Sequence, residues 1–103
     1  MTILSTPITR ACEFAGVPLE TIMTPCKRKP WVRARWAFWY HLVIVEGWSL
    51  PRAARRVKYD HTTVLYGLRR YAAEALGTDM KFTLAEIRSA AQAPLLKLME
   101  TAA

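Results

Sequence analysis

Three consecutive polar side chains, Asp60, His61 and Thr62, have the hydrogen-bonding groups that read base edges in a DNA major groove. A carboxylate can accept from cytosine N4, an imidazole can donate or accept, and a threonine methyl can pack on the methyl of thymine. Ser49-Leu50-Pro51 precedes this triplet and Arg69-Arg70 follows it. Small polar residues at the start of a helix, with arginines nearby, are typical of a helix-turn-helix that enters the major groove.

The same residues also have ordinary structural explanations. Asp60 can be a helix N-cap, and His61 can be an exposed histidine without a ligand. Thr62 and Thr63 can be residues of a first helical turn. The surrounding basic residues favour base reading for the first three positions. Thr63 is predicted to point to a phosphate, a contact that fixes the register of the helix and carries no sequence information.

The positive charge of the chain is concentrated in its middle. The 103 residues have a net charge of +7, and from Lys27 to Arg70 eleven Lys or Arg stand against only two acids. The flanking segments together have four bases and six acids. A basic segment between acidic flanks predicts a face that binds a polyanion such as duplex DNA. An exposed basic surface without a ligand is the alternative.

The remaining composition argues against other classes of protein. Cys12 and Cys26 are not in a metal-ligand spacing, and the scattered acids and two histidines assemble no catalytic group. We therefore expect no enzyme, no metal and no cofactor. The longest apolar stretch, residues 36–45, is about half of a membrane span, and no signal peptide is evident. A cytoplasmic, nucleoid-associated protein without a membrane partner is predicted.

Prolines, glycines and capping residues predict an all-α chain folded as a small helical bundle. Thr6-Pro7 begins a helix that ends at Gly16, and a short helix or turn follows around residues 19–23. From Trp31 to Gly47 apolar residues recur at helical spacing and predict the central core helix. Within it, His41 is predicted to be a core or boundary histidine bonded to a carbonyl.

In the sequence, the basic loop is predicted before that central helix and the helix-turn-helix after it. Pro25 and Pro30 enclose Lys27-Arg28-Lys29, which we expect to be an extended, exposed loop. Ser49 caps a short helix that turns its arginines outward, and Asp60 caps the next helix. The inward seam of that last helix is predicted at Val64, Leu68, Ala72 and Ala75.

A second unit, residues 79–103, is predicted to be a helical extension of the DNA-binding domain at residues 1–78. Thr83 and Glu86 form a capping box that opens a helix. We expect its apolar face to fold back onto the domain, whereas a homodimer through residues 83–101 is the alternative. That face comprises Leu84, Ile87, Ala91, Leu95 and Leu98, with a kink at Pro94.

The run SLPRAARRVKYDHTTVLYGLRR resembles the signature SLPEIG…FGGRDHTTVLHA of the C-terminal DNA-binding domain of the bacterial replication initiator DnaA. Upstream, VPLETIM and Arg33-Ala34-Arg35 resemble the family's helix before its basic loop and the start of the helix after it. The resemblance spans about residues 8–75 and implies a helix-turn-helix. The sequence contains no GxxxxGK[ST] phosphate loop, so it resembles a free-standing reader without the ATPase module.

The resemblance implies a role for each matching residue. Asp60, His61 and Thr62 would face bases in the major groove, and the basic loop would reach the minor groove with Lys27 in the place of an arginine. Arg35 would contact a phosphate, and Leu50-Pro51 would lay the start of a helix against the backbone. From the residues themselves, we add further phosphate contacts at Arg28, Lys29, Lys58, Arg69 and Arg70.

The predicted function is sequence-specific binding of double-stranded DNA, at a site similar to the A/T-rich DnaA box, in the regulation of replication initiation or transcription. The alternative is a protein-interaction module that binds an initiator or a phage or host protein. Single-strand binding through stacking on the four tryptophans is a lesser hypothesis, because three of them lie at helical spacing and predict a bulky core.

Overall fold

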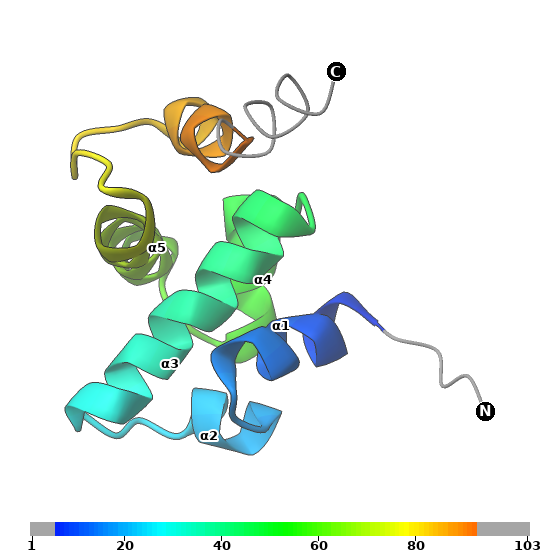
Figure 1. Ribbon diagram of the computed structural model, residues 1–103. Coiled ribbons are helices and arrows are strands. Elements are labelled where there is room, and N and C mark those ends of the chain that lie inside the picture. The colour runs from blue at the N-terminus through cyan, green and yellow to red at the C-terminus, as the bar shows by residue number, and fades with distance from the viewer. Residues whose placement is uncertain (1–5, 93–103) are drawn as a thin grey trace, which may run out of the picture.

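The computed structural model describes residues 6–92, and every regular element among them is a helix (Figure 1). A π-helical turn, η1 (His41–Val45), extends the third helix, and residues 84–92 are also helical. The predicted all-α fold is therefore confirmed. No helix within these residues has the length and apolar character to cross a membrane. The α-helices are α1 (Pro7–Ala15), α2 (Leu19–Met23), α3 (Lys29–Tyr40), α4 (Leu50–Val57) and α5 (His61–Leu76).

Local capping signals set both ends of α1 and the start of α4, as predicted. The Thr6 hydroxyl accepts a hydrogen bond from the backbone amide three residues later at 3.1 Å, and Pro7 follows as the first helical residue. Gly16 ends α1 in the left-handed conformation, with a φ of 78° that glycine adopts without strain. Ser49 caps α4 in the same way as Thr6 caps α1.

The central helix of the core is α3 followed by η1. Phe38, Trp39 and Leu42 are almost completely buried in it. The Glu46 amide donates to the carbonyl of His41, five residues back, at 2.9 Å, which is the hydrogen bond of a π-helix. The apolar spacing predicted the helix but not this wider turn.

An ion-pair network joins α1 to the end of η1. Arg10 donates from Nε and Nη2 to the two carboxylate oxygens of Glu46 at 2.8 and 2.7 Å. His41 Nε2 lies 2.8 Å from Glu46 Oε2, so the partner of His41 is a carboxylate and not the predicted carbonyl. Arg10 above all, with His41 contributing, lowers the pKa of Glu46 to about 2.

The inward face of α5 anchors that helix in the core. Val64, Leu68 and Ala72 are fully buried, as predicted. The prediction was wrong for Ala75, which is exposed. At this end of the helix Leu76 packs against the core instead. Three of the four seam positions therefore hold α5 by apolar burial.

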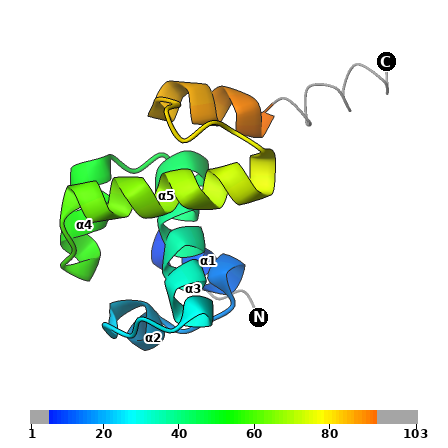
Figure 2. The same ribbon diagram turned by 90° about the vertical axis from the view of Figure 1, so that its left-hand side faces the viewer.

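Gly67 allows α5 to lie close across α3 (Figure 2). A Cβ atom at this position would lie 2.4 Å from Trp36 and 2.7 Å from Trp39. Any other side chain at residue 67 would therefore push the two helices apart or displace an indole.

The helix that begins at residue 84 folds back onto the bundle. Its capping box is reciprocal, with Thr83 N donating to Glu86 Oε1 at 3.0 Å and Glu86 N donating to Thr83 Oγ1 at 3.2 Å. Ile87 is fully buried in the same core as α3 and α5. The predicted folding back is confirmed for residues 84–92, and the homodimer stays a prediction. Pro94, Leu95 and Leu98 lie outside the described residues.

Candidate nucleic-acid interface

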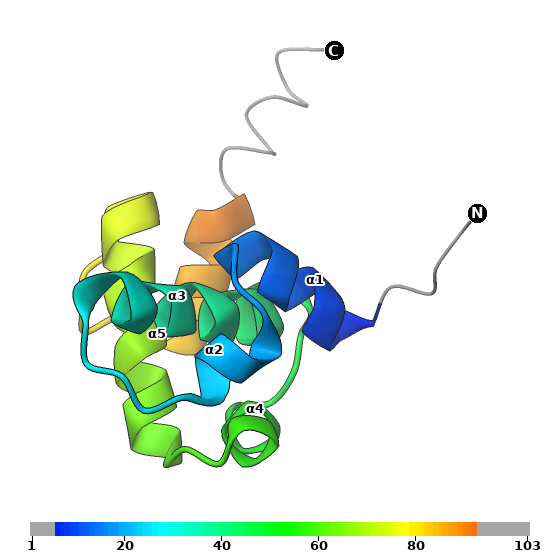
Figure 3. The same cartoon turned by 90° about the horizontal axis from the view of Figure 1, so that it is seen from below.

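A tight turn joins α4 to α5 and sets where α5 begins. Lys58 is in the left-handed conformation with a φ of 59°, which glycine adopts more readily, and the Tyr59 amide donates to the Ala54 carbonyl at 3.1 Å. Tyr59 packs edge-on against Trp39, with ring centroids 5.3 Å apart. The turn is thereby tied to the core, and α4 lies beside the start of α5 (Figure 3).

The start of α5 is an exposed polar surface formed by Asp60, His61, Thr62 and Thr63. Asp60 is at the N-cap position, but its side chain makes no capping hydrogen bond, contrary to the prediction. Its carboxylate accepts from the Thr62 hydroxyl instead, and this bond is the main cause that lowers the pKa of Asp60. His61 Nδ1 lies 3.5 Å from Asp60 Oδ1. A carboxylate, an imidazole and a threonine methyl are thus brought together at the end of the helix.

Arg35 lies beneath the basic loop and not on the surface. Only 7% of the residue is exposed, and its guanidinium donates to the carbonyls of Thr24 at 2.9 Å and Cys26 at 2.5 Å. The guanidinium also lies 5.9 Å from the centre of the Tyr59 ring. The predicted phosphate contact of Arg35 is therefore corrected, because these charge-assisted bonds hold its side chain inward. Arg35 positions the loop and connects it to the turn before α5.

The basic loop itself presents Lys27 and Arg28, which are both exposed. Lys29 was predicted in the same extended loop, but it is the first residue of α3. The helix begins there because Pro30 suits the first turn of a helix, where its missing N–H is no loss. Lys29 is exposed as well. Figure 2 shows this loop below α5 on the same face of the molecule.

One face of α4, including Pro51 near its start, shares a hollow with the start of α5. Leu50 is half-buried and Pro51 is exposed. A hollow of about 270 Å³ is lined by Pro51, Tyr59 and His61 among others. Free backbone N–H groups at the start of a helix favour an anion, so a phosphate at this hollow is compatible with the predicted contact at Leu50-Pro51.

The remaining predicted phosphate contacts differ in how free their side chains are. Lys58 is exposed, whereas Arg69 and Arg70 are half-buried. Arg69 Nε donates to the Phe82 carbonyl at 3.2 Å and so holds the chain that leads to the C-terminal helix. The Arg70 guanidinium lies 5.4 Å from the centre of the Trp36 ring. Arg70 Nε is buried without a hydrogen-bond partner among the described residues.

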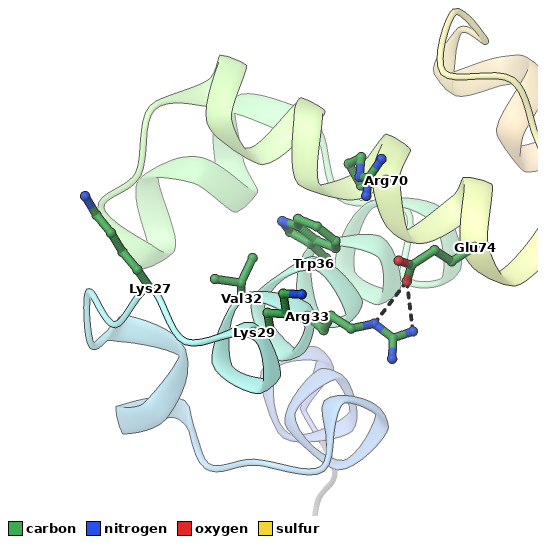
Figure 4. A pocket seen from close by; sticks show the side chains of 7 residues that line it. All are labelled: Lys27, Lys29, Val32, Arg33, Trp36, Arg70 and Glu74. Atoms are coloured by element: carbon green, nitrogen blue, oxygen red, sulfur yellow. Dashed lines mark hydrogen bonds and ion pairs between the residues drawn. The ribbon is translucent and has the colours of Figure 1, made fainter.

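A cavity of about 350 Å³ between the basic loop, α3 and α5 was not predicted (Figure 4). An ion pair lies at one side of it, with Arg33 Nε and Nη2 at 3.0 and 2.8 Å from Glu74 Oε2. In the sequence, the only sign of this site is a tryptophan close to the expected phosphate-binding residues. The other lining residues are Lys27, Lys29, Val32, Trp36 and Arg70.

No family model, curated protein or solved structure matches this chain. Within the part of the chain that the structure describes, no three His, Cys, Asp or Glu side chains are grouped so that they could hold a metal ion. What this surface binds must therefore be inferred from its own chemistry.

Proposed function

We propose that the chain binds duplex DNA in a sequence-dependent manner, with α4 and α5 as its helix-turn-helix. The observation that carries this proposal is the division of α5 into an exposed polar start and a buried apolar seam. A helix held in this way can enter a major groove with only its amino end against the bases. The exposed cations of the loop lie on the same face, where they can meet the phosphate backbone.

The proposed contacts divide into base reading and positioning. Asp60, His61 and Thr62 read bases, since an ionised carboxylate accepts from cytosine N4 and the threonine methyl suits thymine. Lys27 enters the adjacent minor groove, whose negative potential is strongest where A/T-rich sequence narrows it. Phosphate contacts are proposed at Arg28, Lys29, Thr63, Lys58 and the start of α4.

The resemblance to the DNA-binding domain of DnaA supports a finer proposal about the target. The hexamer DHTTVL lies at the start of α5, where the contacts proposed above are made. If these contacts are kept, the preferred duplex is similar to the DnaA box. Occupancy of initiator sites on the nucleoid would then make the protein a regulator of replication initiation or transcription.

The test is fluorescence anisotropy with a labelled duplex containing a DnaA box and a scrambled duplex of the same composition, each titrated across salt. We expect tighter binding to the box and affinities that fall steeply with salt for both duplexes. Equal binding to the two duplexes would remove the proposed sequence preference. No binding at low salt would contradict DNA binding altogether and favour the protein-interaction alternative.

A further inference from the structure

We propose that the cavity between the basic loop, α3 and α5 binds a nucleotide unit with an amino-bearing base, either a free nucleoside monophosphate or an unpaired nucleotide of a DNA strand (Figure 4). Its volume of about 350 Å³ lies within the range of small-ligand sites. The base-reading residues proposed above, Asp60, His61 and Thr62, are not among its lining residues. The cavity combines a stacking wall, several cations in its lining and a polar pair.

The stacking wall is the indole of Trp36, which is half-buried and held from several sides. The close approach to Gly67 fixes one part of the ring, and Tyr66 packs edge-on against it at a centroid distance of 6.4 Å. Arg70 lies over the indole, and Val32 lines the cavity beside it. Because Trp36 also lines the cavity, a nucleobase can stack on the part of the ring that Arg70 leaves open.

Cations around the cavity supply charge for a phosphate. Lys27 and Lys29 are exposed and line the cavity. Arg70 lines it as well, with its guanidinium 5.4 Å from the centre of the Trp36 ring. In Figure 4, Lys27 lies at one end and the pair of Arg33 and Glu74 at the other. The four cations exceed the single acid, which favours an anionic ligand.

The polar pair can recognise the edge of the base. Arg33 contacts only Oε2 of Glu74, with a hydrogen bond from Nε at 3.0 Å and an ion-pair contact from Nη2 at 2.8 Å. Glu74 Oε1 can then accept from the amino group of cytosine, adenine or guanine. Thymine presents a carbonyl oxygen in the position of the cytosine amino group, and this oxygen would face the carboxylate unfavourably.

Nuclear magnetic resonance of the ¹⁵N-labelled protein tests this site directly, with the Trp36 indole N–H signal assigned by its loss in Trp36→Phe. We expect dCMP to shift this signal, to leave that of buried Trp39 unchanged, and to bind about tenfold more tightly than dTMP. Ribose 5-phosphate, which lacks a base, should bind least. An unshifted Trp36 signal with millimolar dCMP, or an equal response to ribose 5-phosphate, would overturn the proposal.

Variants separate the parts of the site. Trp36→Leu should weaken dCMP binding by at least about tenfold through lost stacking. Glu74→Gln and Lys29→Glu change exposed residues and so test the site even if Trp36→Leu fails to fold. Glu74→Gln should abolish the preference for dCMP over dTMP, and Lys29→Glu should weaken both. Wild-type affinities in both variants would contradict the assignment of the cavity.

Two further measurements identify the source of the nucleotide and keep the two proposals apart. If oligodeoxycytidylate shifts the Trp36 signal at a lower concentration of nucleotide units than dCMP does, the ligand is an unpaired strand. If the two concentrations are equal, the ligand is a free nucleotide. Either result supports the site. His61→Ala should lose duplex preference but keep dCMP binding and its preference over dTMP, whereas Glu74→Gln should keep duplex preference and lose the preference for dCMP over dTMP. Loss of dCMP binding in His61→Ala at unchanged fold would overturn the separate site.

Discussion

The start of α5 and the loop between α2 and α3 both expose groups that we propose to touch DNA, but the protein holds them in different ways. Behind the start of α5, Val64, Leu68 and Ala72 are fully buried. Behind the loop, a single guanidinium, that of Arg35, bonds two loop carbonyls. The helix is therefore supported by several apolar contacts that act together, whereas the hydrogen bonds that tie the loop to α3 come from one charged side chain. An element that must keep its register on base pairs gains most from the first arrangement.

Leu68→Ala should have the largest effect, because it opens a cavity in the seam that anchors α5. We expect the free energy of unfolding to fall by about 2–5 kcal/mol. Urea denaturation followed by circular dichroism measures this change. Leu84→Ala, at a half-buried position of the C-terminal helix, is the control and should cost less. A larger loss in Leu84→Ala would show that α5 is not anchored more firmly than the C-terminal helix.

Arg35→Ala should act mainly on the loop, because two carbonyls lose their charge-assisted partner. The expected loss of stability is roughly 1–3 kcal/mol. Amide hydrogen exchange should become faster in residues 24–28. In α5 it should change no more than the overall loss of stability requires. Arg28→Ala, which removes an exposed arginine of the same loop, should leave exchange as it is. Unchanged exchange in Arg35→Ala would contradict the positioning role of Arg35.

Acid should lower the stability of the whole protein. This global effect is the reference for the regional effects of Leu68→Ala and Arg35→Ala. The pKa of Glu46 is lowered from 4.5 to about 2. The folded state therefore favours the ionised carboxylate, and its contribution is fully present above about pH 4.5 and is lost as the pH falls towards 2. Melting temperatures across this range should fall less in Glu46→Gln than in the wild type. Glu20→Gln, which changes an exposed acid of α2, should retain the wild-type slope.

Lys27→Ala should have the smallest effect, since it removes one exposed cation. We expect both box and scrambled duplexes to bind more weakly and the slope of log affinity against log salt to fall by about 0.9. Lys27→Arg should keep the slope and increase the preference for an A/T-rich flank, because a planar guanidinium suits a narrow minor groove. An unchanged salt slope in Lys27→Ala would exclude Lys27 from the DNA contact.

The sequence predicted those parts of the fold that depend on local chemistry. Thr6, Gly16 and Ser49 act at helix ends through their own side chains or backbone freedom, and the structure confirms these boundaries. The exposure of His61 and Thr62 also follows from the spacing of the buried seam. These features need only the neighbouring residues, which the sequence supplies directly.

The sequence could not predict features that depend on packing between distant elements. Whether Arg35 faces solvent is decided by where the carbonyls of Thr24 and Cys26 lie, and a charge pattern carries no such information. The exposure of Ala75 likewise follows from Leu76 packing against the core. The cavity at Trp36 is lined by residues of the loop, α3 and α5, and Gly67 lets α5 lie close to Trp36.

The most direct test of base reading at the start of α5 is the ratio of box to scrambled affinity in His61→Ala, with Ser89→Ala, an exposed residue of the C-terminal helix, as the control. We predict that His61→Ala weakens binding to the box by ~1–3 kcal/mol and leaves the scrambled duplex almost unaffected, so that the ratio falls. Ser89→Ala should keep both affinities. An equal loss on both duplexes in His61→Ala would contradict base reading and reduce His61 to a backbone contact.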